Sequence, residues 1–181
     1  MLDNVDILRG CDEKSVRALA GFRDNDKILK LVPNIAKFQL VLRCIKLWAK
    51  NRGVSSNVCG YFAGITLAIL VARICIDNSQ APENKLIARF FEFYKDYPWS
   101  YEYPIKLQEI LNDKNQAPGA KVEETRFVTL EELKKTKDGM PIITPTFPCM
   151  NSSHNISTST KSVILTEIEK GALITEAILQ G

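Results

Sequence analysis

The chain has 181 residues, of which 45% are hydrophobic, and this is enough for one well-buried domain. Its net charge of +3 comes from 24 basic and 21 acidic side chains, so the overall field attracts nucleic acid weakly and an anion site must be local. A single histidine, His154, and the lack of any CxxC pair exclude most zinc sites. We expect the five cysteines to be buried thiols of a reducing compartment: Cys11, Cys44, Cys59, Cys75 and Cys149.

The N-terminal part predicts two short helical segments. Asp12 is a suitable N-cap for a helix that we expect to end at Gly21, because glycine readily adopts the left-handed conformation of a helix stop. A second helical turn over residues 24–32 is then ended by Pro33.

A longer helix is predicted from the N-cap Asn34 to about Lys50, with Gly53 just beyond its end. Its apolar residues recur every three or four positions, as they do on the buried side of a helix. The predicted buried stripe consists of Phe38, Val41, Ile45 and Trp48, widened by Leu40, Cys44 and Leu47.

The other side of this helix carries a basic ridge, which we define as Gln39, Arg43, Lys46 and Lys50. Cationic groups about one helical turn apart can hold successive phosphate oxygens. The alternative is an ordinary solvated helix face, since exposed lysines are common on amphipathic helices.

Three residues that favour N-caps, Ser55, Ser56 and Asn57, precede an apolar run over residues 58–76. We therefore expect a helix to begin here, with free backbone N–H groups and a positive dipole end that can bind an anion. The run has about the length of a membrane span, but Arg73 near its end and the polar start favour a buried helix of a soluble core.

Another helix is expected to begin at Pro82, a favoured first residue, and to end before Pro98. Its predicted buried face consists of Leu86, Ile87, Phe90, Phe91 and Tyr94. The aromatic run that follows, residues 97–104, has few basic neighbours, which favours a structural role over base stacking.

The last third of the chain predicts less regular structure. Residues 112–126 are expected to form a surface loop, and Thr129 with Glu132 forms a capping box for a short helix. Closely spaced prolines in residues 140–148 exclude a helix and predict an extended strap. A helical pattern resumes at Ser159 and continues to the end, with Gly171 as an interruption.

Several strings, in this order and spacing, resemble the middle domain of eukaryotic poly(A) polymerases. They are LVPN from Leu31, IKLWAK from Ile45, SNxxG from Ser56, MPIITP from Met140 and NISxST from Asn155. The resemblance covers most of the chain and is weakest between about residues 76 and 139. It implies a mainly α fold, a helical bundle with extended straps and a short β element, that forms one domain over residues 1–181.

Poly(A) polymerases add adenylate to the 3′ ends of mRNA in the nucleus, with ATP held between a catalytic domain and this middle domain. The resemblance therefore implies ATP contacts for particular residues of this chain. Lys46 and Lys50 match lysines at the triphosphate, Thr144 matches a threonine near the adenine, and the other matched positions around the nucleotide are Ser55, Asn57, Gly64 and Ile65.

The chain departs from the family pattern at two positions. Ser55 stands where the family usually has a tyrosine near the nucleotide, and Ala20 stands where it usually has an asparagine. Hydrogen bonds to the edge of a base discriminate against other bases far better than pocket shape alone does. The loss of the tyrosine and asparagine side chains is therefore expected to weaken discrimination in favour of adenine.

Nucleotidyl transfer needs metal ions held by carboxylates, which in this family follow a Gly-Ser turn of the catalytic domain. This chain has no Gly-Ser pair, and we interpret Asp24 and Asp26 as surface or capping residues. The resemblance thus implies no catalytic or metal-binding residue here, with Mg²⁺ or Mn²⁺ held by a catalytic domain that this sequence lacks. The chain alone should be inactive, and the RNA-binding domain is also expected to lie outside it.

The partners implied by the resemblance are ATP, the mRNA 3′ end and the cleavage and polyadenylation factors, with no membrane. The alternative is a non-catalytic helical interaction module related to nucleotidyltransferases. Ser55 and Ala20 slightly favour that alternative, because they remove groups that would read the base.

Overall fold

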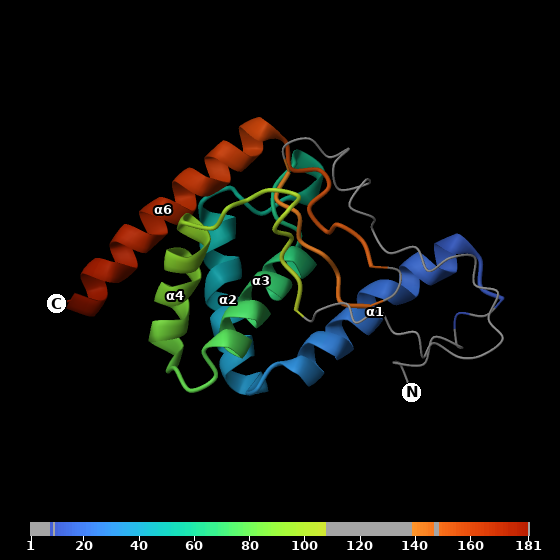
Figure 1. Cartoon of the computed structure of the whole chain (residues 1–181), viewed down its shortest axis with the longest axis horizontal. Helices are drawn as coiled ribbons and strands as arrows, with labels where there is room; N and C mark the ends of the chain where they lie inside the picture. The colour runs from blue at the N-terminus through green and yellow to red at the C-terminus, as the bar shows by residue number, and fades with distance from the viewer. Residues whose placement is uncertain (1–7, 9, 108–138, 147–148, 181) are drawn as a thin grey trace.

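The computed structural model describes residue 8 and residues 10–107, 139–146 and 149–180 (Figure 1). The predicted surface loop at residues 112–126 and the capping box of Thr129 and Glu132 lie outside these residues. The described part is mainly helical, which confirms the predicted fold class. Its only pairings of β type are two isolated bridges, Ile105 with Ile142 and Ile143 with Asn151.

The first helix, α1 (Glu13–Leu31), is one continuous element rather than two short segments. Asp12 caps it as predicted, because its carboxylate accepts a hydrogen bond from the Ser15 N–H at 2.7 Å. The predicted stop at Gly21 is wrong. The helix continues through Gly21 because its later turns are held by tertiary burial, with Ile28 at 1% exposure.

The second helix, α2 (Ile35–Asn51), begins as predicted after the N-cap Asn34, whose side chain accepts from the Lys37 N–H at 3.0 Å. Phe38, Val41 and Ile45 are buried, and Trp48 is half-buried. The predicted widening of this stripe is wrong, since α3 and α4 cover only one side of α2. Three residues on the uncovered side are exposed: Leu40, Cys44 and Leu47.

The apolar run does form a buried helix, α3 (Gly64–Asp77), but it does not begin at residues 55–57. Those residues lead into a single 3₁₀ turn, η2 (Asn57–Cys59), which ends at Gly60 in the left-handed conformation with φ +78°. A right-handed helix cannot run through a left-handed residue, so α3 can start only beyond Gly60. Its N-cap is Ala63. No described helix has the length and apolar content that crossing a membrane requires.

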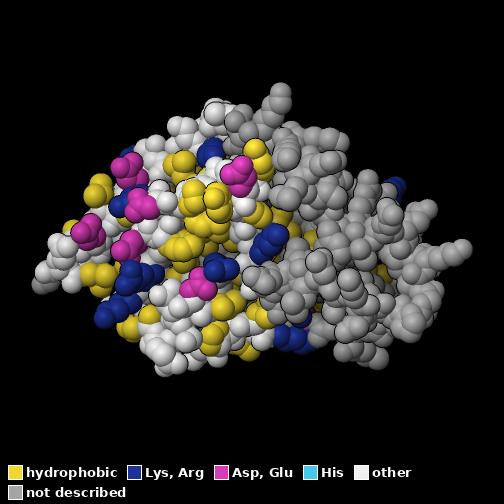
Figure 2. Space-filling view, viewed as in Figure 1, with side chains coloured by type: hydrophobic (Ala, Val, Ile, Leu, Met, Phe, Trp, Pro, Cys, Tyr) yellow, Lys and Arg dark blue, Asp and Glu magenta, His cyan; other side chains and the backbone are white. Residues whose placement is uncertain are grey.

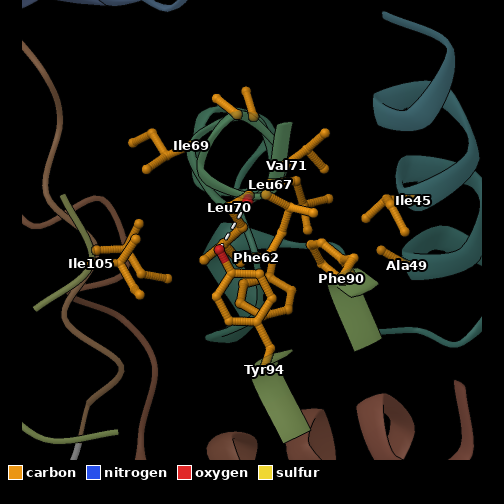
Figure 3. Packing of buried hydrophobic residues seen from close by; sticks show 14 of the residues in the cluster. Ile45, Ala49, Phe62, Leu67, Ile69, Leu70, Val71, Phe90, Tyr94 and Ile105 are labelled. Carbon is orange, nitrogen blue, oxygen red and sulfur yellow. Dashed lines mark hydrogen bonds between the residues drawn. The ribbon is translucent and has the colours of Figure 1, made fainter. Parts of the chain in front are cut away.

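The centre of the molecule is α3, which packs against α1, α2 and α4 (Figure 1). Side chains on several sides of α3 are buried. In the view of Figure 3, Val71 points towards Ile45 and Ala49 of α2, while Ile69 points to the opposite side, where Ile105 lies. A helix that is apolar on all sides is stable only when other elements enclose it.

The fourth helix, α4 (Glu83–Lys95), follows Pro82, which is its N-cap rather than its first residue. The Tyr94 hydroxyl donates a hydrogen bond to the Leu70 carbonyl of α3 at 2.8 Å (Figure 3). Trp99 stacks on the Tyr94 ring, with 5.5 Å between the ring centroids. The Trp99 indole N–H also donates to the Tyr94 carbonyl at 3.1 Å. These contacts confirm the structural role that was predicted for the start of the aromatic run.

The last helix, α6 (Thr158–Gln180), crosses α4 and also contains no break at its glycine (Figure 1). The predicted interruption at Gly171 is wrong. A Cβ atom placed on Gly171 would lie 2.5 Å from ring carbons of Phe91, so glycine is needed here because two helices approach closely.

Substitution of Gly171 by alanine should lower the free energy of unfolding by about 1–3 kcal/mol, since the added methyl group forces Phe91 to move within a packed core. Gly21→Ala is the matched control, because nothing lies within 4 Å of its Cβ position in α1. Alanine should raise stability there by about 0.5–1 kcal/mol. Urea unfolding measures both changes, and equal effects of the two substitutions would contradict the packing assignment.

The cysteines divide into two classes, which corrects the prediction that all five are buried. Cys75 and Cys149 are buried, and burial raises the pKa of each thiol to about 11. Cys11, Cys44 and Cys59 are exposed.

At pH 8 the native chain should therefore react rapidly with a thiol reagent at the three exposed cysteines. Cys75 and Cys149 should react only after denaturation, because they are shielded from the reagent and form little thiolate. Peptide mapping of the labelled protein identifies the sites. Rapid labelling of Cys75 in the folded chain would show that the core around α3 is not closed.

Candidate functional site

The predicted basic ridge lies on the solvent side of α2. Gln39, Arg43, Lys46 and Lys50 are all exposed, while the opposite side of the helix packs on α3 and α4. Arg43 is partly engaged with its own helix, since its Nε donates to the Gln39 carbonyl at 3.3 Å. The two lysines are thus the more available cations of the ridge.

The ridge meets the start of α3 at Lys46. The Lys46 ammonium nitrogen lies 3.9 Å from the position that a Cβ on Gly64 would occupy. The N–H groups of Gly64, Ile65 and Thr66 precede the first hydrogen bond of the helix, from the Leu67 N–H to the Ala63 carbonyl. A side-chain ammonium and the positive end of a helix dipole are therefore close together, an arrangement that a bound anion would stabilise.

The 3₁₀ turn before α3 holds the next predicted residue, Asn57. Its side-chain oxygen Oδ1 is buried and has no hydrogen-bond partner among the described residues. Its backbone carbonyl accepts a hydrogen bond from the Asn155 side chain at 3.2 Å. Ser55, predicted at the same place, is exposed.

The segment after the strap, residues 151–156, covers the start of α3. The Thr66 hydroxyl donates to the Ser152 carbonyl at 3.1 Å, and it also lies 3.1 Å from the Ser152 hydroxyl. Gly60 lies below this segment, and a Cβ there would approach the Asn155 carbonyl oxygen to 2.8 Å. Sequence reasoning did not assign a role to Thr66, Ser152 or Asn155, although the NISxST string from Asn155 marked the region.

Thr144 lies in a hairpin-like part of the strap. Its N–H donates to the Met150 carbonyl at 2.9 Å, and its hydroxyl accepts from the Met150 N–H at 3.0 Å. It is 7% exposed, so only a small part of it reaches the surface. The described part of the strap is non-helical, as predicted. Ser152 connects it to α3, because the Ser152 N–H donates to the Ile142 carbonyl at 2.8 Å and the Ser152 carbonyl accepts from Thr66.

The structure therefore brings together three parts of the sequence: the basic ridge, the η2–α3 junction and the strap. Direct proximity is shown for Lys46 and Gly64. Asn57 is joined to the segment after the strap, because its backbone carbonyl accepts a hydrogen bond from Asn155. Ile65 is half-buried and lies in the first turn of α3.

The interpretation of Asp24 as a surface or capping residue is wrong. Asp24 is 3% exposed and accepts hydrogen bonds from the Thr146 N–H at 3.1 Å and the Thr146 hydroxyl at 2.5 Å. Burial raises its pKa, an effect that these hydrogen bonds and the charge of Arg23 oppose. Asp26 does lie at the surface of α1, where it pairs with Lys30 at 2.7 Å.

Neither aspartate belongs to a metal site in the described part of the chain, which contains no group of three or more potential His, Cys, Asp or Glu ligands. Two open grooves, of about 680 and 480 Å³, lie between α4 and α6. Their lining includes no predicted site residue, and Figure 2 shows basic and acidic side chains intermixed on this face.

Together, the fold and the site describe a mainly helical domain with an open surface formed by a cationic helix, the start of a buried helix and a strap. Residues 37–181 match the family described as the poly(A) polymerase central domain. The chain belongs to this family.

Known relatives agree with this assignment. The chain is 44% identical to nuclear poly(A) polymerase 1 of Arabidopsis thaliana, over 95% of this chain and 23% of the relative. It is 41% identical to the poly(A) polymerase of Dictyostelium discoideum, over 96% of this chain and 20% of the relative. The poly(A) polymerase PAPalpha of Candida albicans is 38% identical, over 99% of this chain and 31% of that protein. The chain thus spans less than a third of each of these relatives.

The link between Thr66 and Ser152 should be important for stability. Thr66→Val removes a fully buried hydroxyl that joins α3 to Ser152 in the segment after the strap. This substitution should lower the free energy of unfolding by about 1–2 kcal/mol. Thr166→Val is the control, since that exposed hydroxyl bonds only within α6, to the Ser162 carbonyl. The control should change stability by less than about 0.5 kcal/mol in thermal or urea unfolding. An unchanged free energy of unfolding in Thr66→Val would show that the link between Thr66 and Ser152 does not stabilise the fold.

Proposed function

We propose that this chain forms the nucleotide-contacting part of a nuclear poly(A) polymerase, an enzyme that transfers AMP from ATP to the 3′ end of mRNA. The observation that carries the proposal is the position of the Lys46 ammonium beside the start of α3. A triphosphate bound between these positive groups would be stabilised by both, through charge-assisted hydrogen bonds and the helix dipole.

In this proposal each predicted residue has a defined role. Lys46 and Lys50 bind phosphate oxygens, and Gly64 leaves room for a close approach of the ligand to the helix start. The Asn57 oxygen, buried and without a partner among the described residues of the free chain, accepts a hydrogen bond from an N–H or O–H group of the nucleotide once the side chain turns towards the ligand. Ile65 and Ser55 line the same region, and the Thr144 hydroxyl, which accepts from Met150, keeps its own proton to donate to the adenine.

Metal ions would provide charge neutralisation for the transfer reaction. Because the described residues contain no ligand cluster, we propose that Mg²⁺ or Mn²⁺ is held by another part of the enzyme. This chain would bind and orient ATP without supplying a catalytic residue. The mRNA 3′ end, the cleavage and polyadenylation factors and a nuclear location complete the proposal, which is supported by relatives named as nuclear poly(A) polymerases.

A second candidate is a non-catalytic helical interaction module. The observation that favours it is the exposed apolar side of α2, with Leu40 at 44% and Leu47 at 60% exposure beside the ridge. Such a surface fits a protein partner as well as it fits a neighbouring domain.

A hybrid enzyme separates the two candidates. In it, this chain replaces the matching segment of the Arabidopsis nuclear poly(A) polymerase 1, to which it is 44% identical. We expect the hybrid to add AMP to an oligoadenylate primer in the presence of Mg²⁺. A folded hybrid that shows no activity would favour the interaction module.

Within the hybrid, Lys46→Ala should raise KM for ATP by about tenfold or more, because one charge-assisted phosphate contact contributes about 1.5–3 kcal/mol. Lys85→Ala, at an exposed position on α4, is the matched control and should leave KM unchanged. Steady-state kinetics with varied ATP provide the measurement. Equal KM values for the Lys46→Ala and unsubstituted hybrids would overturn the phosphate assignment.

A further inference from the structure

One buried carboxylate has no part in the nucleotide surface described above. Asp24 projects from the middle of α1 and binds the strap through both the N–H and the hydroxyl of Thr146, although 122 residues separate the two in sequence. A buried carboxylate is costly to desolvate, and its hydrogen bonds offset this cost only if the geometry is maintained. The pair, here called the Asp24–Thr146 latch, is therefore a specific contact between α1 and the strap.

The latch holds one end of the hairpin that contains Thr144. The arms of this hairpin are joined by the Ile143–Asn151 bridge and by the two hydrogen bonds between Thr144 and Met150. Thr146 lies two residues beyond Thr144 on the arm that contains Ile142. At the other end, the Ser152 N–H and hydroxyl both contact the Ile142 carbonyl, at 2.8 and 2.9 Å.

Thr144 thus lies between two anchors from different helices. Ser152 connects the base of the hairpin to α3 through Thr66, and Asp24 connects Thr146, farther along the hairpin, to α1. Without the latch, the part of the hairpin near Thr146 would keep the packing of the buried Cys149 but lose its hydrogen bonds to α1, and the Thr144 hydroxyl would be held less firmly. Small displacements of a group that orients a substrate have large effects on its use.

We propose that Asp24 is a positioning residue for ATP, because the Asp24–Thr146 latch fixes the strap hairpin so that Thr144 faces the adenine. This inference rests on the proposed function of the strap. Asp24 itself touches neither the nucleotide nor a metal ion.

The first test measures the latch in the 181-residue chain without any nucleotide. Asp24→Ala removes both hydrogen bonds to Thr146, and Thr146→Val removes only the one from its hydroxyl. Hydrogen exchange of the Thr144 and Met150 amides should become about tenfold faster in Asp24→Ala and change less in Thr146→Val. Asp24→Asn keeps an acceptor oxygen and should restore slow exchange. Asp26→Ala, two residues along α1, is the matched control and should leave both amides unchanged.

The second test places the same substitutions in the hybrid enzyme. Asp24→Ala should raise KM for ATP several-fold with little change in kcat, and Asp24→Asn should restore KM. A purely structural role would instead lower the active fraction, which reduces apparent kcat at unchanged KM. If Asp24→Ala does not fold, Thr146→Val provides the same comparison with a smaller effect.

The outcomes distinguish this inference from the proposed function. Unchanged exchange at Thr144 and Met150 in Asp24→Ala would overturn the latch, whatever the kinetics show. Faster exchange with an unchanged KM, while Lys46→Ala still raises KM, would overturn the positioning role and leave the proposed function standing. If neither Lys46→Ala nor Asp24→Ala affects KM, the proposed function fails, and the inference that rests on it fails too.

Discussion

The enclosure of α3 is the constraint on which the rest of the structure depends. This helix is buried along almost its whole length, so α1, α2, α4 and the strap must surround it. One polar contact of α3 in the core is the hydrogen bond that the Tyr94 hydroxyl donates to the Leu70 carbonyl (Figure 3), and another joins the buried Thr66 hydroxyl to Ser152. Because α2 packs directly against α3, the start of α3 lies at a fixed position beside the ridge, and Lys46 reaches Gly64.

Polar contacts decide the arrangement at the edge of this core. In their described part, the strap and the segment after it, residues 151–156, have little regular secondary structure and are held by hydrogen bonds to α1, α3 and η2. Each such bond is worth only about 0.5–1.5 kcal/mol, but a buried donor or acceptor that loses its partner costs more. These two segments can therefore hold one conformation without a β-sheet, and Gly60 allows the Asn155 carbonyl to approach its backbone closely.

The surface formed in this way is open rather than enclosed. Lys46 and Lys50 are exposed, and neither lines the two grooves between α4 and α6. An open cationic surface would bind a nucleotide strongly only when a second surface excludes water from the other side. This agrees with the proposal that the chain contributes one part of a larger enzyme, since its relatives are more than three times as long.

The sequence alone determined the elements whose signals are local. The N-caps Asp12 and Asn34 follow from the chemistry of neighbouring residues. The helical period predicts the exposed ridge and the buried residues of α2, which are Phe38, Val41 and Ile45, and the composition of α3 predicts that it is apolar on all sides. The family resemblance added the site residues, whose nucleotide contacts remain proposals.

Only the tertiary structure decided that α1 continues through Gly21, that Gly171 packs on Phe91, and that Leu40 and Leu47 stay exposed. It also decided that Asp24 is buried against Thr146, because burial and pairing between residues far apart in sequence depend on which helices pack together, and local patterns carry no information about that.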